Sequence, residues 1–286
     1  MPLHDIAPTV VSHVLIRSEN ILGVFLIAAR GGGGRGGCVS PLQSVIHFAQ
    51  VPSMNLDEFQ RLAVARRAVR GFKTDPLPEG MLERLLDAAR WAPSGYNLQP
   101  THFLTVTDAA LKAPLRVACM DQKQIEQAPA TVIFVGDRRV ATNNFKHMIA
   151  HEEQAGSLHP KYREALEKYV ALAFHTGPAG LGWLWKATLP AVMRVGTPMP
   201  ELPAIHRRYW LAKQVSLSAM VFMLAATAAG LGTCPMEGFD ETRVKRLLKI
   251  PSHMVVVMVV PVGYSADGPQ SRTRLPLEKH IHRNGW

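Results

Sequence analysis

Residues 93–100 read Pro-Ser-Gly-Tyr-Asn-Leu-Gln-Pro and carry polar groups suited to binding a flat polar ligand. We expect Pro93 to end the preceding helix and Gly95 to allow a turn where a Cβ would clash. The segment contains the hydroxyl side chain of Ser94 and the amide side chains of Asn97 and Gln99. Such groups at short intervals could hydrogen bond to the edge of a planar ring. A turn that satisfies only its own backbone explains this segment equally well.

A second group with chemical potential is a cluster of arginines. Arg66, Arg67 and Arg70 lie within five residues, with Ala68 between them. Guanidinium groups this close repel one another unless they share an anion or face water. The cluster is therefore either an ordinary solvated one or an anion clamp, in which two guanidiniums hold a phosphate while the third lies near a flavin or nucleotide ring.

The third and fourth segments lie near the C-terminus. Residues 235–240, Pro-Met-Glu-Gly-Phe-Asp, form a predicted turn between a long apolar helix and a helix capped by Asp240. Residues 271–276, Ser-Arg-Thr-Arg-Leu-Pro, bring cations back near the end of the chain. Taken alone, the latter segment is as well explained by a solvated basic tail as by a binding site.

Helices and strands must position these four segments. Asn55 or Asp57 is expected to cap a first helix, which runs into the arginine cluster and ends at Gly71. A second helix starts at Pro78 and leads to residues 93–100. Further helices are predicted at 111–127, 142–154, 160–174, 209–231 and 240–248, and strands at 103–106, 130–135 and 254–262. Because strands and helices intermix, we predict an α+β or α/β body.

Composition sets broad limits on the function. The chain has 286 residues, 47% of them apolar, and a net charge of +10. Lys and Arg are spread along most of the chain, so the charge is weak support for nucleic acid or membrane as a partner. The three cysteines, Cys38, Cys119 and Cys234, show no pairing pattern, which favours a reducing, cytoplasmic compartment. The apolar stretch 215–231 fits a buried helix better than a membrane span, so we expect no integral membrane insertion.

Two regions differ from the rest of the chain. Residues 1–53 hold a short apolar run followed by a Gly/Arg-rich stretch, which indicates a disordered extension or a start placed ahead of Met54. A targeting segment is the alternative for this region. Residues 175–203 are rich in Gly and Pro around Trp183 and Trp185, as expected for a lid, a partner surface, a membrane contact or a segment packed on the body. The folded domain is therefore predicted to span residues 54–286.

Taken together and in this order, the four segments resemble the FMN-dependent nitroreductase family over residues 55–286. Residues 210–215, Trp-Leu-Ala-Lys-Gln-Val, and 235–240 are especially similar to the oxygen-insensitive bacterial nitroreductases. The resemblance implies an α+β fold with a central mixed or antiparallel sheet flanked by helices. It also implies an interlocked homodimer whose two FMN sites are built from residues of both chains.

The resemblance further assigns a cofactor-binding set to this sequence. The arginine cluster and the tail are expected at the phosphate, ribityl chain and pyrimidine edge, residues 93–99 along the flavin, and residues 235–238 near N5. Glu237 is expected to hold the turn as a hydrogen-bond acceptor rather than to react. Ala68 stands where the family often has Ser, so one hydroxyl contact is missing. The full set is Arg66, Arg67, Ala68, Arg70, Pro93, Ser94, Gly95, Asn97, Gln99, Pro235, Met236, Glu237, Gly238, Arg272 and Arg274.

The chemistry that the resemblance implies is a ping-pong cycle. NADH or NADPH delivers a hydride to FMN and leaves, and a small flat acceptor such as a nitroaromatic or quinone is then reduced in the same cleft. No catalytic side chain and no metal is required. Some relatives instead dehalogenate iodotyrosines or cleave flavin, but the intact Asn97 and Gln99 favour a reductase.

Two other classes of function stay open at this point. A basic module could bind a membrane surface or nucleic acid through the arginine clusters. The sequence shows no nucleic-acid-binding motif and no basic stripe interleaved with aromatic residues, so nucleic acid is not expected as a partner. The other alternative is a protein that binds flavin without turnover.

Overall fold

The computed structural model describes residues 54–175, 202–268 and 273–286, together with isolated positions between 182 and 198. The predictions for residues 1–53, Trp183, Trp185 and Arg272 fall outside the described residues. The helices are α1 Leu56–Ala65, α2 Met81–Arg90, α3 Ala109–Ala118, α4 Gln124–Gln127, α5 Val140–Asn143, α6 Phe145–Gln154, α7 Pro160–Phe174, α9 Arg207–Ala228 and α10 Glu241–Leu247. The strands are β1 Thr101–Val106, β2 Ala130–Asp137, β3 Gly232–Thr233 and β4 Met254–Gly263, and short 3-10 turns lie at Gly95–Asn97 and Leu277–Lys279.

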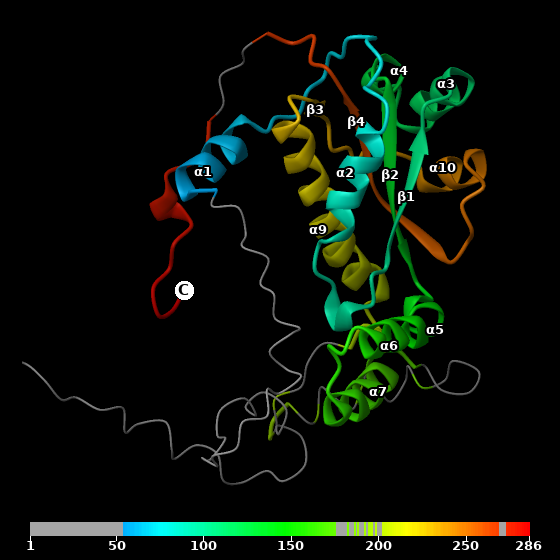
Figure 1. Cartoon of the computed structure of the whole chain (residues 1–286), viewed down its shortest axis with the longest axis vertical. Coiled ribbons are helices and arrows are strands. Elements are labelled where there is room, and N and C mark those ends of the chain that lie inside the picture. The colour runs from blue at the N-terminus through cyan, green and yellow to red at the C-terminus, as the bar shows by residue number, and fades with distance from the viewer. Residues whose placement is uncertain are drawn as a thin grey trace, which may run out of the picture.

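The four strands form one antiparallel sheet in the order β1-β2-β4-β3. Every residue of β2 is buried, as expected for a central strand whose sequence is almost continuously apolar. Helices α2 and α9 cover one face of the sheet, and α3, α4 and α10 cover the other (Figure 1). This arrangement confirms the predicted α+β fold with an antiparallel central sheet flanked by helices.

Helix α9 is the central helix of the molecule. Among the described residues, it is the helix whose length and composition would allow it to cross a membrane. Its buried side chains, including Leu211, Val215 and Phe222, pack against the sheet and α2. This packing is that of a core helix. Each fully buried apolar side chain stabilises the fold by about 1.5–3 kcal/mol relative to an exposed one.

The first helix begins as predicted but ends earlier. Asn55 caps α1 in a capping box: its side chain accepts from the Glu58 N–H at 2.8 Å, and the Glu58 carboxylate accepts from the Asn55 N–H at 3.1 Å. The prediction that this helix continues into the arginine cluster was wrong, because α1 ends at Ala65. Beyond it the backbone pairs with β3, where the Val69 N–H donates to the Thr233 carbonyl at 2.9 Å.

Three other predicted boundaries also shift. Helix α2 starts at Met81 rather than Pro78, because Gly80 before it adopts a left-handed conformation with φ of 70°. The helix predicted over 111–127 is divided into α3 and α4, since Met120 and Asp121 both have φ of 56°. The long helix predicted over 209–231 spans Arg207–Ala228 instead.

Candidate functional site

The arginine segment lies beside β3, just after the end of α9. Ala68 forms a parallel bridge with Thr233, and Val69 is buried against Gly232. A Cβ at Gly232 would come within 2.6 Å of the Val69 side chain, so only glycine lets the two backbones approach this closely. The Thr233 hydroxyl is buried and has no hydrogen-bond partner among the described residues. The methyl side chain of the adjacent Ala68 cannot provide one.

A carboxylate from the C-terminal part of the chain fixes the backbone of Arg70. Asp267 Oδ2 accepts from the Arg70 N–H at 2.8 Å and from the Gly71 N–H at 3.1 Å. A Cβ at Gly71 would lie 2.5 Å from Asp267 Oδ1, so the glycine is needed for this contact. The guanidiniums of Arg67 and Arg70 are exposed and donate to no other described residue. They are therefore available to an anion.

The turn at residues 235–238 follows Thr233, which bridges to Ala68 of the arginine segment. Met236 is buried and pairs with Val259 through two backbone hydrogen bonds of 2.9 and 3.1 Å. Burial raises the pKa of the Cys234 thiol next to the turn, and the Arg70 cation opposes this shift. We call the arginine segment and this turn, residues 66–70 and 235–238, the cationic group.

Gln122 holds this turn, a role that the sequence did not indicate. Its Nε2 donates to the Gly238 carbonyl at 3.0 Å, and a Cβ at Gly238 would come within 3.3 Å of that nitrogen. The exposed Glu237 carboxylate makes no hydrogen bond to a described residue, so its predicted part in holding the turn is not seen. In the described part of the chain, the N–H groups of Glu237 and Gly238 also have no acceptor. They can donate to a ligand.

The loop of residues 93–99, which we call the polar loop, lies at the other end of α9. The Gly95 N–H donates to Gln214 Oε1 on α9 at 2.7 Å, and the Ser94 hydroxyl accepts from the Gln99 N–H at 2.9 Å. Asn144 Nδ2 donates to the carbonyls of Leu98 and Gln99 at 3.1 and 3.2 Å. The Leu98 side chain is fully buried and anchors the loop in the core, whereas Asn97 and Gln99 on either side of it are exposed.

The turn within the polar loop is not made as predicted. Gly95 does not have a positive φ; Tyr96, Asn97 and Gln99 do, with φ of 57°, 51° and 51°. A Cβ at Gly95 would lie 3.4 Å from the Trp210 ring, which is an ordinary contact rather than a clash. Left-handed conformations at bulky residues are rare and persist where surrounding contacts enforce them, often at binding sites.

The amide side chains of the polar loop already have protein partners. Asn97 Nδ2 donates to Glu152 Oε1 on α6 at 2.7 Å, and Gln99 Nε2 lies 3.4 Å from Asn97 Oδ1. Both amides line a cavity of about 260 Å³ together with His147 and His151. Gln214, Asn144 and Glu152 were not predicted as site residues, because only the fold brings them next to the loop.

A single chain does not bring the cationic group and the polar loop together. The loop contacts α9 at Gln214, whereas Gly232 follows the C-terminal end of α9. At about 1.5 Å of rise per residue, the stretch of α9 between these contacts is roughly 20 Å long.

Arg274 is exposed, and its Nη1 donates only to the Thr273 carbonyl among the described residues.

Comparisons with known proteins agree with this fold. The sequence profile of the nitroreductase family matches residues 63–264. The NADH dehydrogenase of Thermus thermophilus is 33% identical over 223 residues, which cover 77% of this chain and 92% of that protein. MhqN of Bacillus subtilis, a candidate NAD(P)H nitroreductase, is 29% identical, with coverages of 72% and 88%.

Solved structures agree as well. The crystal structure of ydfN from Bacillus subtilis, a candidate nitroreductase, superimposes with a TM-score of 0.62 at 27% identity and covers 80% of this chain and 100% of its own. A candidate nitroreductase from Exiguobacterium sibiricum, solved in complex with FMN, gives a TM-score of 0.60 at 22% identity and coverages of 79% and 97%. At that identity the second likeness concerns the fold alone.

Proposed function

This chain belongs to the nitroreductase family, and from that membership we propose that it is an FMN-dependent NAD(P)H oxidoreductase acting on nitroaromatics, quinones or similar flat acceptors. The names of its relatives support the NAD(P)H part, and the FMN complex of a structural neighbour supports the cofactor. The observation that carries the proposal is the pair of polar surfaces described above, each with donors that no described residue uses.

The groups present fit FMN chemically. The phosphate requires cations, which the exposed guanidiniums of Arg67 and Arg70 supply. The edge of the ring requires hydrogen-bond donors, which the N–H groups of Glu237 and Gly238 supply. The Ser94 hydroxyl already accepts one hydrogen bond, so its own O–H is free to donate.

We propose further that each complete site takes the cationic group from one chain and the polar loop from a partner chain. Two observations support a homodimer of this kind: the two surfaces are separated by most of α9, and α1 has no buried residue even though it is amphipathic. The C-terminal Leu275, Leu277 and Trp286 are likewise exposed. A second copy would cover such apolar surface and complete both sites.

In this arrangement the protein's own residues bind, orient and exclude water rather than react. When bound, FMN supplies the hydride chemistry, first with NAD(P)H and then with the acceptor, in a ping-pong cycle. The guanidiniums would hold the phosphate end, and the turn that Gln122 fixes would offer two N–H donors to the edge of the ring. The polar loop, held by Gln214 and Asn144, would lie along the flavin and offer it the Ser94 O–H. No side chain need be a general acid or base.

The visible absorption spectrum of the purified protein, from Met54 onward, tests this proposal. We expect a flavin spectrum that bleaches on anaerobic addition of NADH or NADPH and returns when a nitroaromatic or quinone is added. Initial rates at varied concentrations of both substrates should give the parallel double-reciprocal lines of a ping-pong cycle. A colourless protein that takes up no added FMN would contradict the proposal and favour a basic binding module. A flavin that NAD(P)H does not bleach would indicate a flavin-binding protein without turnover.

A further inference from the structure

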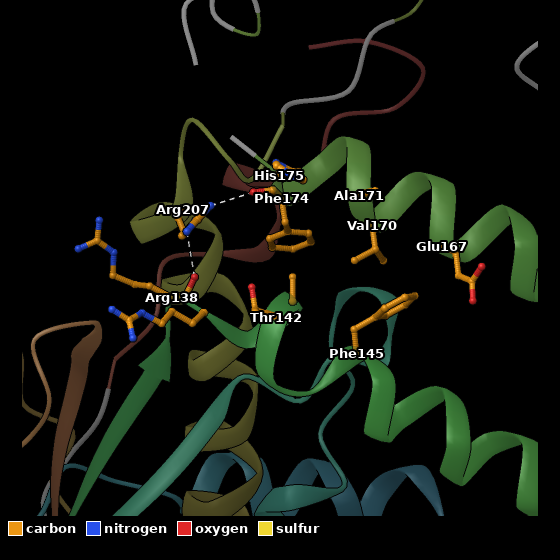
Figure 2. Close-up of a pocket in the computed structure, with 11 residues that line it drawn as sticks. Arg138, Thr142, Phe145, Glu167, Val170, Ala171, Phe174, His175 and Arg207 are labelled. Carbon is orange, nitrogen blue, oxygen red and sulfur yellow. Dashed lines mark hydrogen bonds between the residues drawn. The ribbon is translucent and has the colours of Figure 1, made fainter. Parts of the chain in front are cut away.

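A cavity of about 400 Å³ lies between α5, α6, α7 and the start of α9, and none of the predicted cofactor-binding residues lines it. Figure 2 shows Thr142, Phe145 and Phe174 directed toward it, from α5, α6 and α7. Its volume falls within the range of small-molecule sites. The cavity is partly open to solvent.

One end of this cavity is strongly cationic. Arg138, Arg139 and Arg207 line it, and Figure 2 shows Arg138 and Arg207 together at the end away from Glu167. The guanidiniums of Arg138 and Arg139 are exposed and make no hydrogen bond or ion pair within the described part of the chain. Their side chains are therefore free to adjust to a ligand.

Arg207 is rigidly placed and incompletely neutralised. Its Nη1 and Nη2 donate to the carbonyls of Arg138 and Phe174 at 3.1 and 3.0 Å, while its Nε is buried with no partner among the described residues. Burial lowers the pKa of Arg207, and the nearby Arg138 cation lowers it further. The buried Asp137 carboxylate acts in the opposite direction, and an anion bound at this end would add to it and offset the repulsion from Arg138.

The rest of the described cavity lining is mainly apolar. Phe145, Val170, Ala171 and Phe174 provide the apolar part. The one carboxylate among the described lining residues, Glu167, lies at the opposite end and accepts from Arg163 Nε at 3.2 Å, so it is not a competing anion for the arginines. The cavity thus combines a cationic end with a mainly apolar body.

We propose that this cavity binds a small organic anion, a carboxylate attached to a flat or short apolar body. The carboxylate lies at the arginine end, where a guanidinium can hold it with two parallel hydrogen bonds, and the body packs on Phe145 and Phe174. A bare phosphate would leave the apolar part unused. A neutral ligand of the same shape would leave the arginines without a counter-ion. This site is additional to the FMN sites of the proposed function and does not depend on them.

Phe174 lines this cavity and also contacts the polar loop. The Phe174 ring packs edge-on against Trp210, with centroids 5.0 Å apart, and against Tyr96 of the loop, with centroids 6.2 Å apart. The same side chain therefore touches both the bound anion and the strained part of the loop.

Isothermal titration of the purified full-length protein, after saturation with FMN, tests the proposal with benzoate as the probe. Benzamide, its neutral counterpart, and inorganic phosphate are titrated in parallel. We expect benzoate to bind at least tenfold more tightly than either, since a charge-assisted pair is worth about one to two factors of ten. Benzamide or phosphate binding as tightly as benzoate would overturn the proposal.

Two variants locate the binding. In the double variant Arg138→Gln with Arg139→Gln, benzoate should bind at least tenfold more weakly, because both replaced guanidiniums are exposed and bear no structural contact. The matched control is Arg84→Gln with Arg246→Gln, which removes two exposed arginines elsewhere and should change the affinity less than twofold. Ala171→Phe adds a large side chain to the wall of the cavity and should weaken benzoate binding with all charges kept. Benzoate affinity that is unchanged in Arg138→Gln/Arg139→Gln or in Ala171→Phe would contradict the assignment.

Discussion

At the scale of single residues, the proposed FMN site depends on side chains that hold its backbone in place. Asp267 is the clearest case. One of its carboxylate oxygens accepts hydrogen bonds from two backbone N–H groups, those of Arg70 and Gly71, and so fixes the backbone from which the Arg70 side chain extends. Gln122 does the same for the turn at Gly238. Neither was predicted from the sequence, because an Asp or Gln in a loop is ordinary until the fold shows which backbone groups it meets.

Asp267→Ala should therefore weaken FMN binding and destabilise the fold. Two backbone N–H groups lose their acceptor, at a cost of about 1–3 kcal/mol each at most, and the Arg70 backbone is released. We expect roughly tenfold weaker FMN binding in a fluorescence-quenching titration, and a lower urea midpoint. Asp87→Ala removes an exposed carboxylate paired with Arg90 and should change neither quantity appreciably. Equal effects of the two substitutions would show that Asp267 has no special role.

A buried thiol gives a pH-dependent prediction. Burial raises the pKa of Cys119 to about 12, against 9.0 for an exposed thiol. Above pH 9 the unfolded thiol ionises while the folded one stays protonated, so the free energy of unfolding should fall as the pH rises from 9 toward 12. Urea midpoints at pH 8.0, 9.5 and 10.5 measure this loss. Cys119→Ala should show a smaller decrease over the same range, and an identical decrease would mean that Cys119 does not contribute.

At the scale of elements, the sequence predicts best where a structure depends on near neighbours. The Asn55 and Asp240 caps were placed correctly, since each side chain bonds a backbone N–H three residues ahead. The prediction failed for residues 66–70, which pair with Thr233 rather than continuing α1, because a contact between residues far apart in the sequence overrides local helix propensity. The left-handed Tyr96 and Asn97 were missed for a similar reason, since the anchors at Gln214 and Asn144 come from distant elements.

Helix α9 should control the polar loop through Gln214. In Gln214→Ala the Gly95 N–H loses its acceptor, and the loop is expected to become mobile at its first residue. FMN binding should weaken roughly tenfold, whereas Gln214→Glu keeps an acceptor oxygen and should retain most of the affinity. Gln154→Ala, at the exposed end of α6, is the matched control and should bind FMN normally. Normal FMN affinity in Gln214→Ala would show that this hydrogen bond does not position the loop.

At the scale of the whole molecule, three of the four sequence segments are divided between the two ends of α9: residues 66–70 and 235–240 lie on the β3 side, and residues 93–100 contact the helix at Gln214. The linear sequence shows all of them but does not show which lie together, since that depends on the direction in which α9 runs through the core. In Figure 1, residues 66–70 follow α1 on the β3 side of the molecule, whereas the polar loop lies beside α6. Each chain is therefore expected to hold two half-sites rather than one site.

Complementation between two defective chains tests this division. The arginine variant carries Arg67→Ala and Arg70→Ala, and the loop variant carries Ser94→Ala and Asn97→Ala. A homodimer of either has a defect in both sites, because every site uses one cationic group and one polar loop. A mixed dimer places both defects in one site and leaves the other intact, so it should bind about half of the wild-type FMN and show about half of its activity.

Mixed dimers can be isolated by giving the two variants different affinity tags and purifying in two steps. As controls, each variant is co-produced with a second copy of itself that carries the other tag. The doubly tagged protein from these controls should hold little FMN. If each site lay within a single chain, the mixed dimer would be as defective as these controls, since both of its chains carry a damaged site. If the chain were monomeric, no doubly tagged protein would be recovered. Recovery of flavin only in the mixed dimer would follow from one arrangement alone, in which the cationic group of one chain meets the polar loop of the other.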